Sequence, residues 1–350
     1  MGILTPEFTQ DLQTNVKLIA AREYQRLLKD MWWTKVAKQR PSEGRSERLV
    51  WLLDSARIER VDPGSVNFED ILSKTTEIVS KFASAGLNIK KELLEDLAGG
   101  VYGGEGLEMA AHWARQMGAL AAYWPQKQVA IAIRTNPAAY DGLDFFHAAH
   151  PVNPFKTSAG TYANNITGAV LNTAGLGSAA AKIDDSVTLD VAVQNVARVI
   201  AYAASIKMPN GEDPRGLRLV GLMHPPALAA RAQQITNAKV IAQAAATGGG
   251  GADVEAVVRN FGLGQPIQAD ELGSSFTGGS DTSWYALMAD AAQDELPAFL
   301  YVNREPFSIV AHNGTTSAEL ARTRELQWTT AGRNEVGTGH PYHLLRVPNA

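Results

Sequence analysis

The chain has 350 residues, of which 45% are hydrophobic and 19% charged, a composition typical of globular proteins rather than disordered or membrane ones. Cysteine is absent, which excludes disulfides, thiolate nucleophiles and cysteine-ligated metals. The formal net charge of -4 argues against a dedicated nucleic-acid binder, because such domains carry a basic excess that neutralises phosphates. The longest apolar run is far shorter than the roughly 18 to 20 residues that a bilayer span requires, and the N-terminus shows no secretory signal.

The N-terminal region is polar and mixed in charge. Apolar residues at helix-like spacings predict a helix from Gln10 to Met31, which is followed by Trp32 and Trp33. The turn-rich, charged segment from Gln39 to Arg45 is typical of a linker. We therefore interpret residues 1–45 as an extended arm.

Two strands are predicted next, at residues 49–53 and 75–82, with Asp62-Pro63-Gly64 as a turn between them. Isolated two-stranded ribbons are marginal in water. This long excursion therefore needs support from a neighbouring molecule. A short helix is expected at residues 89–98, ended by two glycines.

The longest helical pattern covers residues 107–124, with a stripe of small side chains that would let another element approach closely. Pro125 predicts a kink or a restart of the helix. Dense proline and glycine turns then exclude a helix from Asn136 to Pro154.

The second half mixes helices and strands without the regular alternation of a Rossmann or TIM fold, which predicts the α+β class. Asp185 or Ser186 is expected to cap the first of two helices. The predicted helices cover residues 186–203 and 227–246, and the predicted strands cover 217–223, 284–289, 299–302, 307–311 and 342–347.

The search for chemistry identifies no catalytic, cofactor-binding or metal-ligating residues. His147 and His150 are three residues apart, but Pro151 follows at once, and a zincin motif needs four-residue spacing with a glutamate between the histidines. A structural loop is the expectation there, with a metal-dependent hydrolase as the rival. The glycine-rich stretches at residues 99–106 and 248–251 lack the lysine and the strand context of phosphate-binding loops.

Several stretches together resemble the Mu-like phage major head subunit family. The first runs from Tyr140 to Val152, and the second, from Leu219 to Leu228, is a strand leading into a proline-opened helix. The late strand pair, Trp284 to Ala289 and Pro297 to Tyr301, is also similar, as is the stretch from Phe82 to Asp96. The resemblance covers most of the chain from Leu49 onward.

This resemblance implies the HK97-like major capsid protein fold, with an N-terminal arm, an extended loop (E-loop), a peripheral domain with a spine helix, and an axial domain. The corresponding expectations are an arm at residues 1–45, the extended loop at 46–86, the peripheral domain at 87–185, the axial domain at 186–312, and C-terminal strands at 313–350 returning to the peripheral domain. A scaffold or maturation protease is expected as a separate protein or as a segment already removed, and no covalent cross-link is predicted.

The implied function is that of a major head protein that self-assembles into an icosahedral shell around double-stranded DNA, with no enzymatic activity and no cofactor. The expected partners are other copies in hexamers and pentamers, the portal, scaffold or protease, possible decoration proteins, and DNA bound without sequence specificity; no membrane is expected. The expected location is the virion, assembled in the host bacterial cytoplasm. An encapsulin-like nanocompartment shell is the alternative.

Three tryptophans are candidates for inter-subunit contacts, because the predicted arm and extended loop pack poorly within one chain. They are Trp32, Trp33 and Trp51. The alternative, that they are ordinary core residues, is left equally open.

Overall fold

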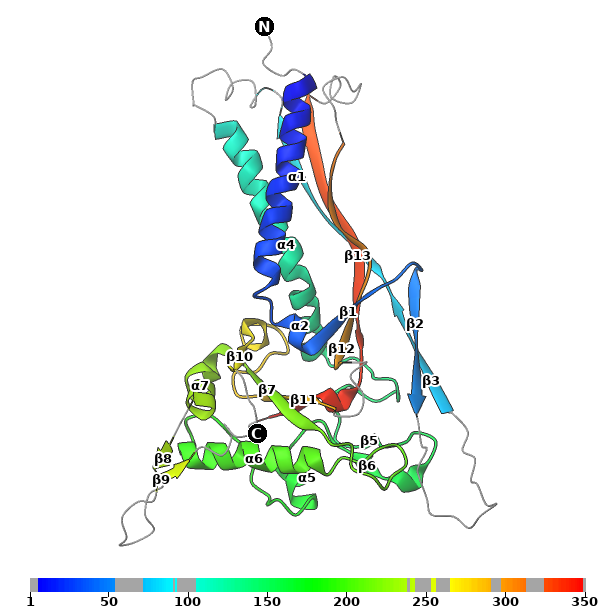
Figure 1. Cartoon of the computed structure of the whole chain (residues 1–350), viewed down its shortest axis with the longest axis vertical. Helices are drawn as coiled ribbons and strands as arrows, with labels where there is room; N and C mark the ends of the chain where they lie inside the picture. Colours follow the sequence, from blue (N-terminus) through cyan, green and yellow to red (C-terminus); the bar gives the residue numbers. More distant parts are fainter. Residues whose placement is uncertain are drawn as a thin grey trace.

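The computed structural model has a tall upper part, a broad lower body and a two-stranded ribbon that stands to one side (Figure 1). Its elements segregate into helix pairs and mostly antiparallel sheets, which confirms the α+β class. Their order, with an arm, an extended ribbon, a long helix beside a long sheet and a second body, is that of the expected HK97-like plan. The structure describes residues 6–53, 72–90, 92, 105–237, 240–242, 253–255, 265–290, 297–312 and 324–348.

The upper part is built on two long helices, α1 (Pro6–Leu28) and α4 (Glu105–Thr135). The predicted stripe of small residues on α4 is where they meet, since Ala110 and Ala114 are fully buried. A Cβ at Gly118 would lie only 2.4 Å from the carbonyl oxygen of Ala20. The close approach of the two helices therefore depends on glycine at this position.

A four-stranded sheet covers one side of these helices, in the order β1-β12-β13-β4. It contains β1 (Ala37–Pro41), β12 (Phe299–Ala311), β13 (Glu325–Thr338) and β4 (Lys81–Lys90). The first pair is parallel and the other two pairs are antiparallel. Leu326 and Trp328 of β13 are buried with α1 and α4 in one apolar cluster.

The ribbon consists of β2 (Ser46–Leu53) and β3 (Leu72–Val79), paired in antiparallel register. It contacts the long sheet near its base, where a Cβ on Gly337 would lie 2.0 Å from the Ile78 side chain. The short helix α2 (Trp33–Val36) joins the arm to β1.

The lower body is organised around a second sheet, in the order β10-β7-β11-β14. Its strands are β10 (Ile267–Gln268), β7 (Arg218–His224), β11 (Trp284–Ala289) and β14 (Leu344–Val347). The helices α5 (Gly168–Thr173), α6 (Leu189–Ala204) and α7 (Ala229–Asn237) lie around it. Their apolar faces and the segment 152–183 share one core with β7, β11 and β14.

Four short strands and four 3-10 turns complete the described elements. The strands pair as β5 (His150–Pro151) with β6 (Thr161–Tyr162) and β8 (Val240–Ala242) with β9 (Asp253–Glu255). The turns are η1 (Thr157–Ala159), η2 (Pro226–Leu228), η4 (Asp270–Leu272) and η5 (Pro341–His343).

Several sequence predictions are wrong in detail. Of the two outcomes predicted at Pro125, the restart is wrong, because the helix α4 continues through the proline as one element, with buried residues on both sides packed in two separate cores. The helix α6 is preceded by Thr188 as its N-cap residue rather than by Asp185 or Ser186. The helix predicted at 227–246 ends at Asn237, and the strand β4 extends to Lys90, into the helix predicted at 89–98, most of which lies outside the described residues.

Candidate functional site

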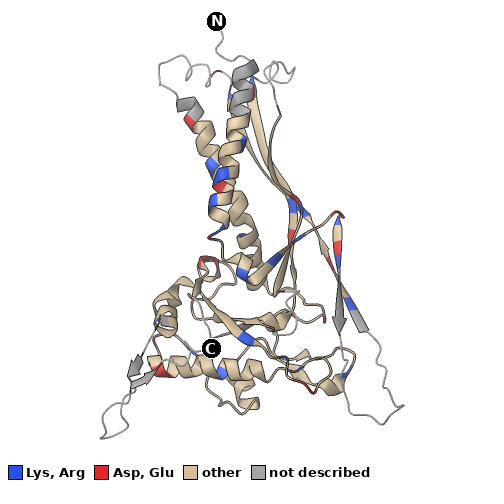
Figure 2. Ribbon diagram, viewed as in Figure 1, with Lys and Arg blue, Asp and Glu red and all other residues tan. Residues whose placement is uncertain are grey.

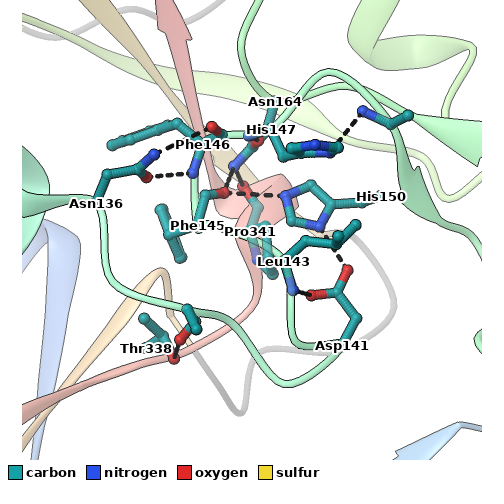
Figure 3. Close-up of polar contacts among 12 residues, drawn as sticks. Asn136, Asp141, Leu143, Phe145, Phe146, His147, His150, Asn164, Thr338 and Pro341 are labelled. Atoms are coloured by element: carbon teal, nitrogen blue, oxygen red, sulfur yellow. Dashed lines mark hydrogen bonds and ion pairs between the residues drawn. The ribbon is translucent and has the colours of Figure 1, made fainter.

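A network of buried polar groups joins the foot of α4 to the C-terminal segment (Figure 3). The helix ends at Thr135, and Asn136 adopts a positive φ of 52° while its N–H donates to the Ala132 carbonyl at 3.1 Å. Asparagine tolerates this left-handed conformation, which commonly ends a helix. The Asn136 side chain also holds Phe146, accepting from its N–H at 2.6 Å and donating to its carbonyl at 3.3 Å. One residue thus ends the helix and fixes the loop that follows.

The centre of the network is a buried pair, His150 and Asp141, whose side chains are 0% and 1% exposed. The two carboxylate oxygens of Asp141 contact different groups. Oδ1 accepts a hydrogen bond from the Leu143 N–H at 3.1 Å, and Oδ2 lies 2.6 Å from Nδ1 of His150. The second ring nitrogen of His150, Nε2, lies 3.0 Å from the Phe145 carbonyl oxygen. Because that carbonyl can only accept, Nε2 carries a proton and donates it. The imidazole therefore connects the strand β5, which contains His150, to the turn at Asp141 and to the backbone at Phe145.

Asn164 is fully buried and also makes hydrogen bonds to the loop that follows α4. Its Oδ1 accepts from the His147 N–H at 2.8 Å, and its Nδ2 donates to the carbonyls of Phe145 at 2.5 Å and Pro341 at 3.2 Å. Its side-chain polar atoms thus find partners in two separate segments, the loop at residues 145–147 and Pro341. This arrangement ties the loop after α4 to the chain's last residues, so the upper part and the lower body are held together by specific hydrogen bonds.

The geometry of His147 and His150 does not suit a metal centre. Both ring nitrogens of His150 are engaged with its own chain, and Nδ1 of His147 accepts from the Ala149 N–H at 3.1 Å. The two rings meet edge to face with centroids 5.7 Å apart. Among the described residues no group of three potential metal ligands occurs. These contacts favour the structural-loop interpretation over the hydrolase rival.

The structure places Trp32 and Trp33 in the chain's own core, with exposed fractions of 7% and 3%. The Trp32 backbone N–H donates to Gln126 at 3.1 Å, and its indole N–H donates to Glu271 at 3.2 Å. The ring of Trp33 packs 5.5 Å from that of Tyr301. Burial within one chain fits the core alternative, and the assignment of these two residues as inter-subunit contacts stays a prediction. The side chain of the third candidate, Trp51, lies outside the described residues.

Glu271 was not identified from the sequence, yet its buried carboxylate joins three parts of the fold. It is 4% exposed and accepts from the Trp32 indole at 3.2 Å and from the Gln126 amide at 2.6 Å. Burial, reinforced by a hydrogen bond to Glu271, raises the pKa of Tyr123 above its ordinary value, which keeps that phenol protonated as a further donor. Nothing in the local sequence Asp270-Glu271-Leu272 distinguishes this residue from a surface acid.

The remaining sequence candidates add no chemistry. Residues 99–104 and 248–251 of the glycine-rich stretches lie outside the described residues. None of the described helices is both long and apolar enough to cross a bilayer. Figure 2 shows acidic and basic residues together on the ribbon, whereas on α4 the acidic Glu108 is followed only by the basic residues Arg115, Lys127 and Arg134.

Large apolar side chains are exposed on every part of the molecule. The most exposed is Phe82 on β4, at 62%. The others lie on α1, α4, β3, β7, β12, α6 and two loops: Leu18, Met109, Leu120, Val79, Val220, Val310, Val191, Phe155 and Phe276. Apolar residues scattered singly are normal on a soluble surface, so only those that adjoin a groove bear on partners.

Comparison with known proteins identifies one family. Residues 14–176 match the model of the Mu-like prophage major head subunit gpT family, and no curated protein matches the chain. Among solved structures, the chain is similar to the bacteriophage JBD30 capsid, with TM-score 0.46, 12% identity and coverage of 90% of this chain and 64% of that one. The mature capsid of bacteriophage PhiM1 gives TM-score 0.48 and 10% identity, covering 89% of this chain and 84% of that one.

A similar match is the SrpI encapsulin from Synechococcus elongatus PCC 7942, with TM-score 0.43, 9% identity and coverage of 93% of this chain and 89% of that one. The chain spans less than two thirds of the length of the JBD30 capsid chain described above. The matched region includes most of α1, the ribbon, α4 and the pair of His150 and Asp141. Over residues 14–176, somewhat less than half of its length, the chain is similar to the Mu-like prophage major head subunit family.

Proposed function

We propose that this chain is the major head protein of a tailed phage or prophage, and that its copies self-assemble into an icosahedral shell enclosing double-stranded DNA. The observation that carries the proposal is the family match over residues 14–176. The shape supports it, because the ribbon of β2 and β3 stands beside the body as a two-stranded sheet, and such ribbons are marginal without a partner surface.

The division into an arm, extended loop, peripheral domain and axial domain remains part of this proposal, with two changes. Residues 152–183 and the strand β14 share a core with α6, so we assign them to the axial body rather than to the peripheral domain. The long strand β13 stays with α4 in the peripheral domain. The C-terminal segment thereby connects both parts.

In this proposal the chain performs no catalysis. The two histidines that most resemble a catalytic pair are engaged in holding their own loop. Hexamers and pentamers of the chain, a portal, a scaffold or protease and possible decoration proteins are its partners, and DNA is enclosed without sequence-specific contacts. Assembly in the host bacterial cytoplasm and residence in the virion follow from that role.

Electron microscopy of the purified chain tests the proposal. Closed, hollow particles of uniform diameter are expected, whereas a uniform population of monomers would contradict it. An encapsulin-like shell is the second candidate and would give similar particles. It is distinguished by a neighbouring cargo enzyme gene in place of portal, terminase and tail genes.

A further inference from the structure

Two buried side chains hold the base of the ribbon against the rest of the chain. Among the described side chains of β2 and β3, Leu49 and Ile78 are buried and the others are at least partly exposed. Both pack in one small apolar cluster with Leu300 and Val302 of β12 and with Tyr140. Because the ribbon stands to one side of the molecule (Figure 1), its angle depends mainly on this cluster.

The ribbon has room to move once this cluster loosens. A space of about 470 Å³ lies between the base of the ribbon and the foot of α4, with Ile78 and Ala138 among its walls. Toward the sheet, by contrast, Ile78 lies so close to Gly337 that a Cβ there would overlap its side chain. A further contact of the ribbon places the Lys74 ammonium 5.9 Å from the centre of the Phe155 ring, and a partly exposed cation–π contact of this kind is weak.

The loop after α4 contains a tight turn that is fixed by its own backbone. Residues 137–145 form this connecting turn. The Ala139 N–H donates to the Leu143 carbonyl at 2.7 Å, and the Phe145 N–H donates to the Pro137 carbonyl at 2.8 Å. A turn closed by such hydrogen bonds moves as one piece, because bending it would leave buried backbone groups unpaired.

Two consecutive residues of the connecting turn, Tyr140 and Asp141, contact different parts of the molecule. Tyr140 is 8% exposed and packs on the base of the ribbon. Asp141 is buried and lies 2.6 Å from the His150 ring in the polar network (Figure 3). The Cα atoms of neighbouring residues are about 3.8 Å apart. A shift of Tyr140 therefore also moves the residue that holds His150.

Tyr140 also reaches the lower body through a series of ring contacts. Its ring meets that of His340 edge to face at 6.0 Å, and His340 stacks on Tyr342 at 4.7 Å. The Tyr342 ring in turn lies 6.4 Å from that of Tyr162. Both of these tyrosines belong to the core of the lower body. One side chain of the connecting turn thus contacts the ribbon on one side and the lower body on the other.

We propose that the ribbon and the polar network form one coupled unit, in which the connecting turn transmits a change in the angle of the ribbon to the attachment of the lower body. Tyr140 is the positioning residue of this unit, since it contacts Ile78 of the ribbon cluster and the His340 ring. A partner that binds the ribbon and changes its angle therefore alters the link between the upper part and the lower body. By linkage, a change in the network alters the ribbon to the same extent.

Hydrogen exchange of the unassembled full-length chain, followed by mass spectrometry, tests the coupling. Ile78→Ala removes the ribbon's side of the contact and leaves Tyr140 and the network in place. The Asn164 N–H donates to the His147 carbonyl at 3.1 Å, so exchange at residues 161–166 measures opening of the network. These amides are expected to exchange at least about fivefold faster, the lower end of the coupling between linked sites, while the amides of α6 keep their rates.

The matched control is Val79→Ala, which truncates the next residue of β3, a side chain that is 42% exposed. Exchange at residues 161–166 is expected to stay unchanged in this variant. Two results for Ile78→Ala would overturn the proposal. Faster exchange confined to the ribbon would show that nothing is transmitted, and equally faster exchange throughout the chain, α6 included, would show only a general loss of stability.

A double substitution tests the role of Tyr140 itself. In a chain that already carries Tyr140→Ala, Ile78→Ala is expected to add no further acceleration at residues 161–166, because the two changes interrupt the same route. Full additivity at these amides would show that the route does not pass through Tyr140. If Tyr140→Ala does not fold, Tyr140→Leu takes its place, since it keeps an apolar side chain against the ribbon and removes the ring that meets His340.

The reverse direction gives an independent measurement. The Ser80 N–H donates to the Arg45 carbonyl at 3.1 Å at the base of the ribbon. Asn164→Ala weakens the network from a distant segment and is expected to accelerate exchange at Ser80, whereas an unchanged rate there would contradict the coupling. The inference goes beyond the proposed function because it concerns a single chain. All of these measurements are made without particles, so failure of the coupling and failure of shell assembly are observed separately.

Discussion

Mild acid is expected to destabilise the unassembled subunit through His340. Its ring stacks on Tyr342 at 4.7 Å and meets Tyr140 edge to face at 6.0 Å. Burial, followed by the charges of His343 and Arg215, lowers the pKa of His340 well below its ordinary value of 6.5. As the pH drops below about 6.5, this imidazole therefore binds a proton in the unfolded chain but stays neutral in the folded chain. The free energy of unfolding falls as a result.

The size of the decrease in unfolding free energy follows from the binding of this one proton. With the folded imidazole neutral, the unfolding free energy at pH 5.5 is lower than at pH 7.5 by about 1.4 kcal/mol per such histidine. Burial also lowers the pKa of His224, which adds a loss of the same sign. The His340→Phe variant keeps an aromatic ring in the stack and removes the proton site, so its stability should depend less on pH by up to that amount.

Urea denaturation of the unassembled subunit between pH 7.5 and 5.5 measures the effect. The His112→Gln variant serves as control, because that histidine is exposed on α4. An equal pH dependence in His340→Phe and the unsubstituted chain would show that the reasoning about this buried ring is incorrect.

Three further substitutions have definite expectations. Trp33→Ala should lower the unfolding free energy of the subunit by about 3 to 5 kcal/mol, as for a large core side chain. A decrease below about 1 kcal/mol in urea denaturation would contradict the buried position of this side chain. Gly118→Leu should displace α1 from α4 and make the arm sensitive to limited proteolysis, whereas Gln116→Ala, on the exposed face of α4, should not. Equal digestion of the two variants would contradict the close approach of the two helices. Asp141→Asn should be tolerated, because its amide can donate to a neutral His150, whereas Asp141→Ala should cost about 1 to 3 kcal/mol; equal thermal shifts for the two variants would refute the paired geometry.

The elements that could be predicted from the sequence are those whose own pattern determines their structure. The helix α6 repeats apolar residues every three or four positions, and its observed span, Leu189–Ala204, lies close to the prediction. The strand β11, Trp284–Ala289, was predicted with its observed bounds, since a short apolar run among turn residues has few other solutions. The predicted close approach to the small-residue stripe of α4 is also confirmed.

Elements that depend on distant partners were missed. The strand β13 carries glycine, asparagine and arginine in its central part, and it is strand-like because β12 and β4 pair with both of its edges. The runs predicted at 299–302 and 307–311 form one strand, β12, because β13 lies alongside across the register shifts between them. Tertiary pairing overrides local propensity in both strands.

The polar network could be predicted only in part. The stretch around His150 carried the family resemblance, but the roles of Asp141 and Asn164 depend on hydrogen bonds to segments as far away as Pro341. Glu271 gives no local signal because its donors come from α4 and from the arm. Sequence spacing contains no information about such contacts.

The central claim is that copies of this chain bury surface against one another to build a closed shell. Sedimentation velocity of the purified chain over a wide range of concentration and salt tests it most directly. The account predicts a sharp, fast boundary of uniform particles that coexists with subunits or capsomers. A single slow boundary from a compact monomer at every concentration and salt would contradict it.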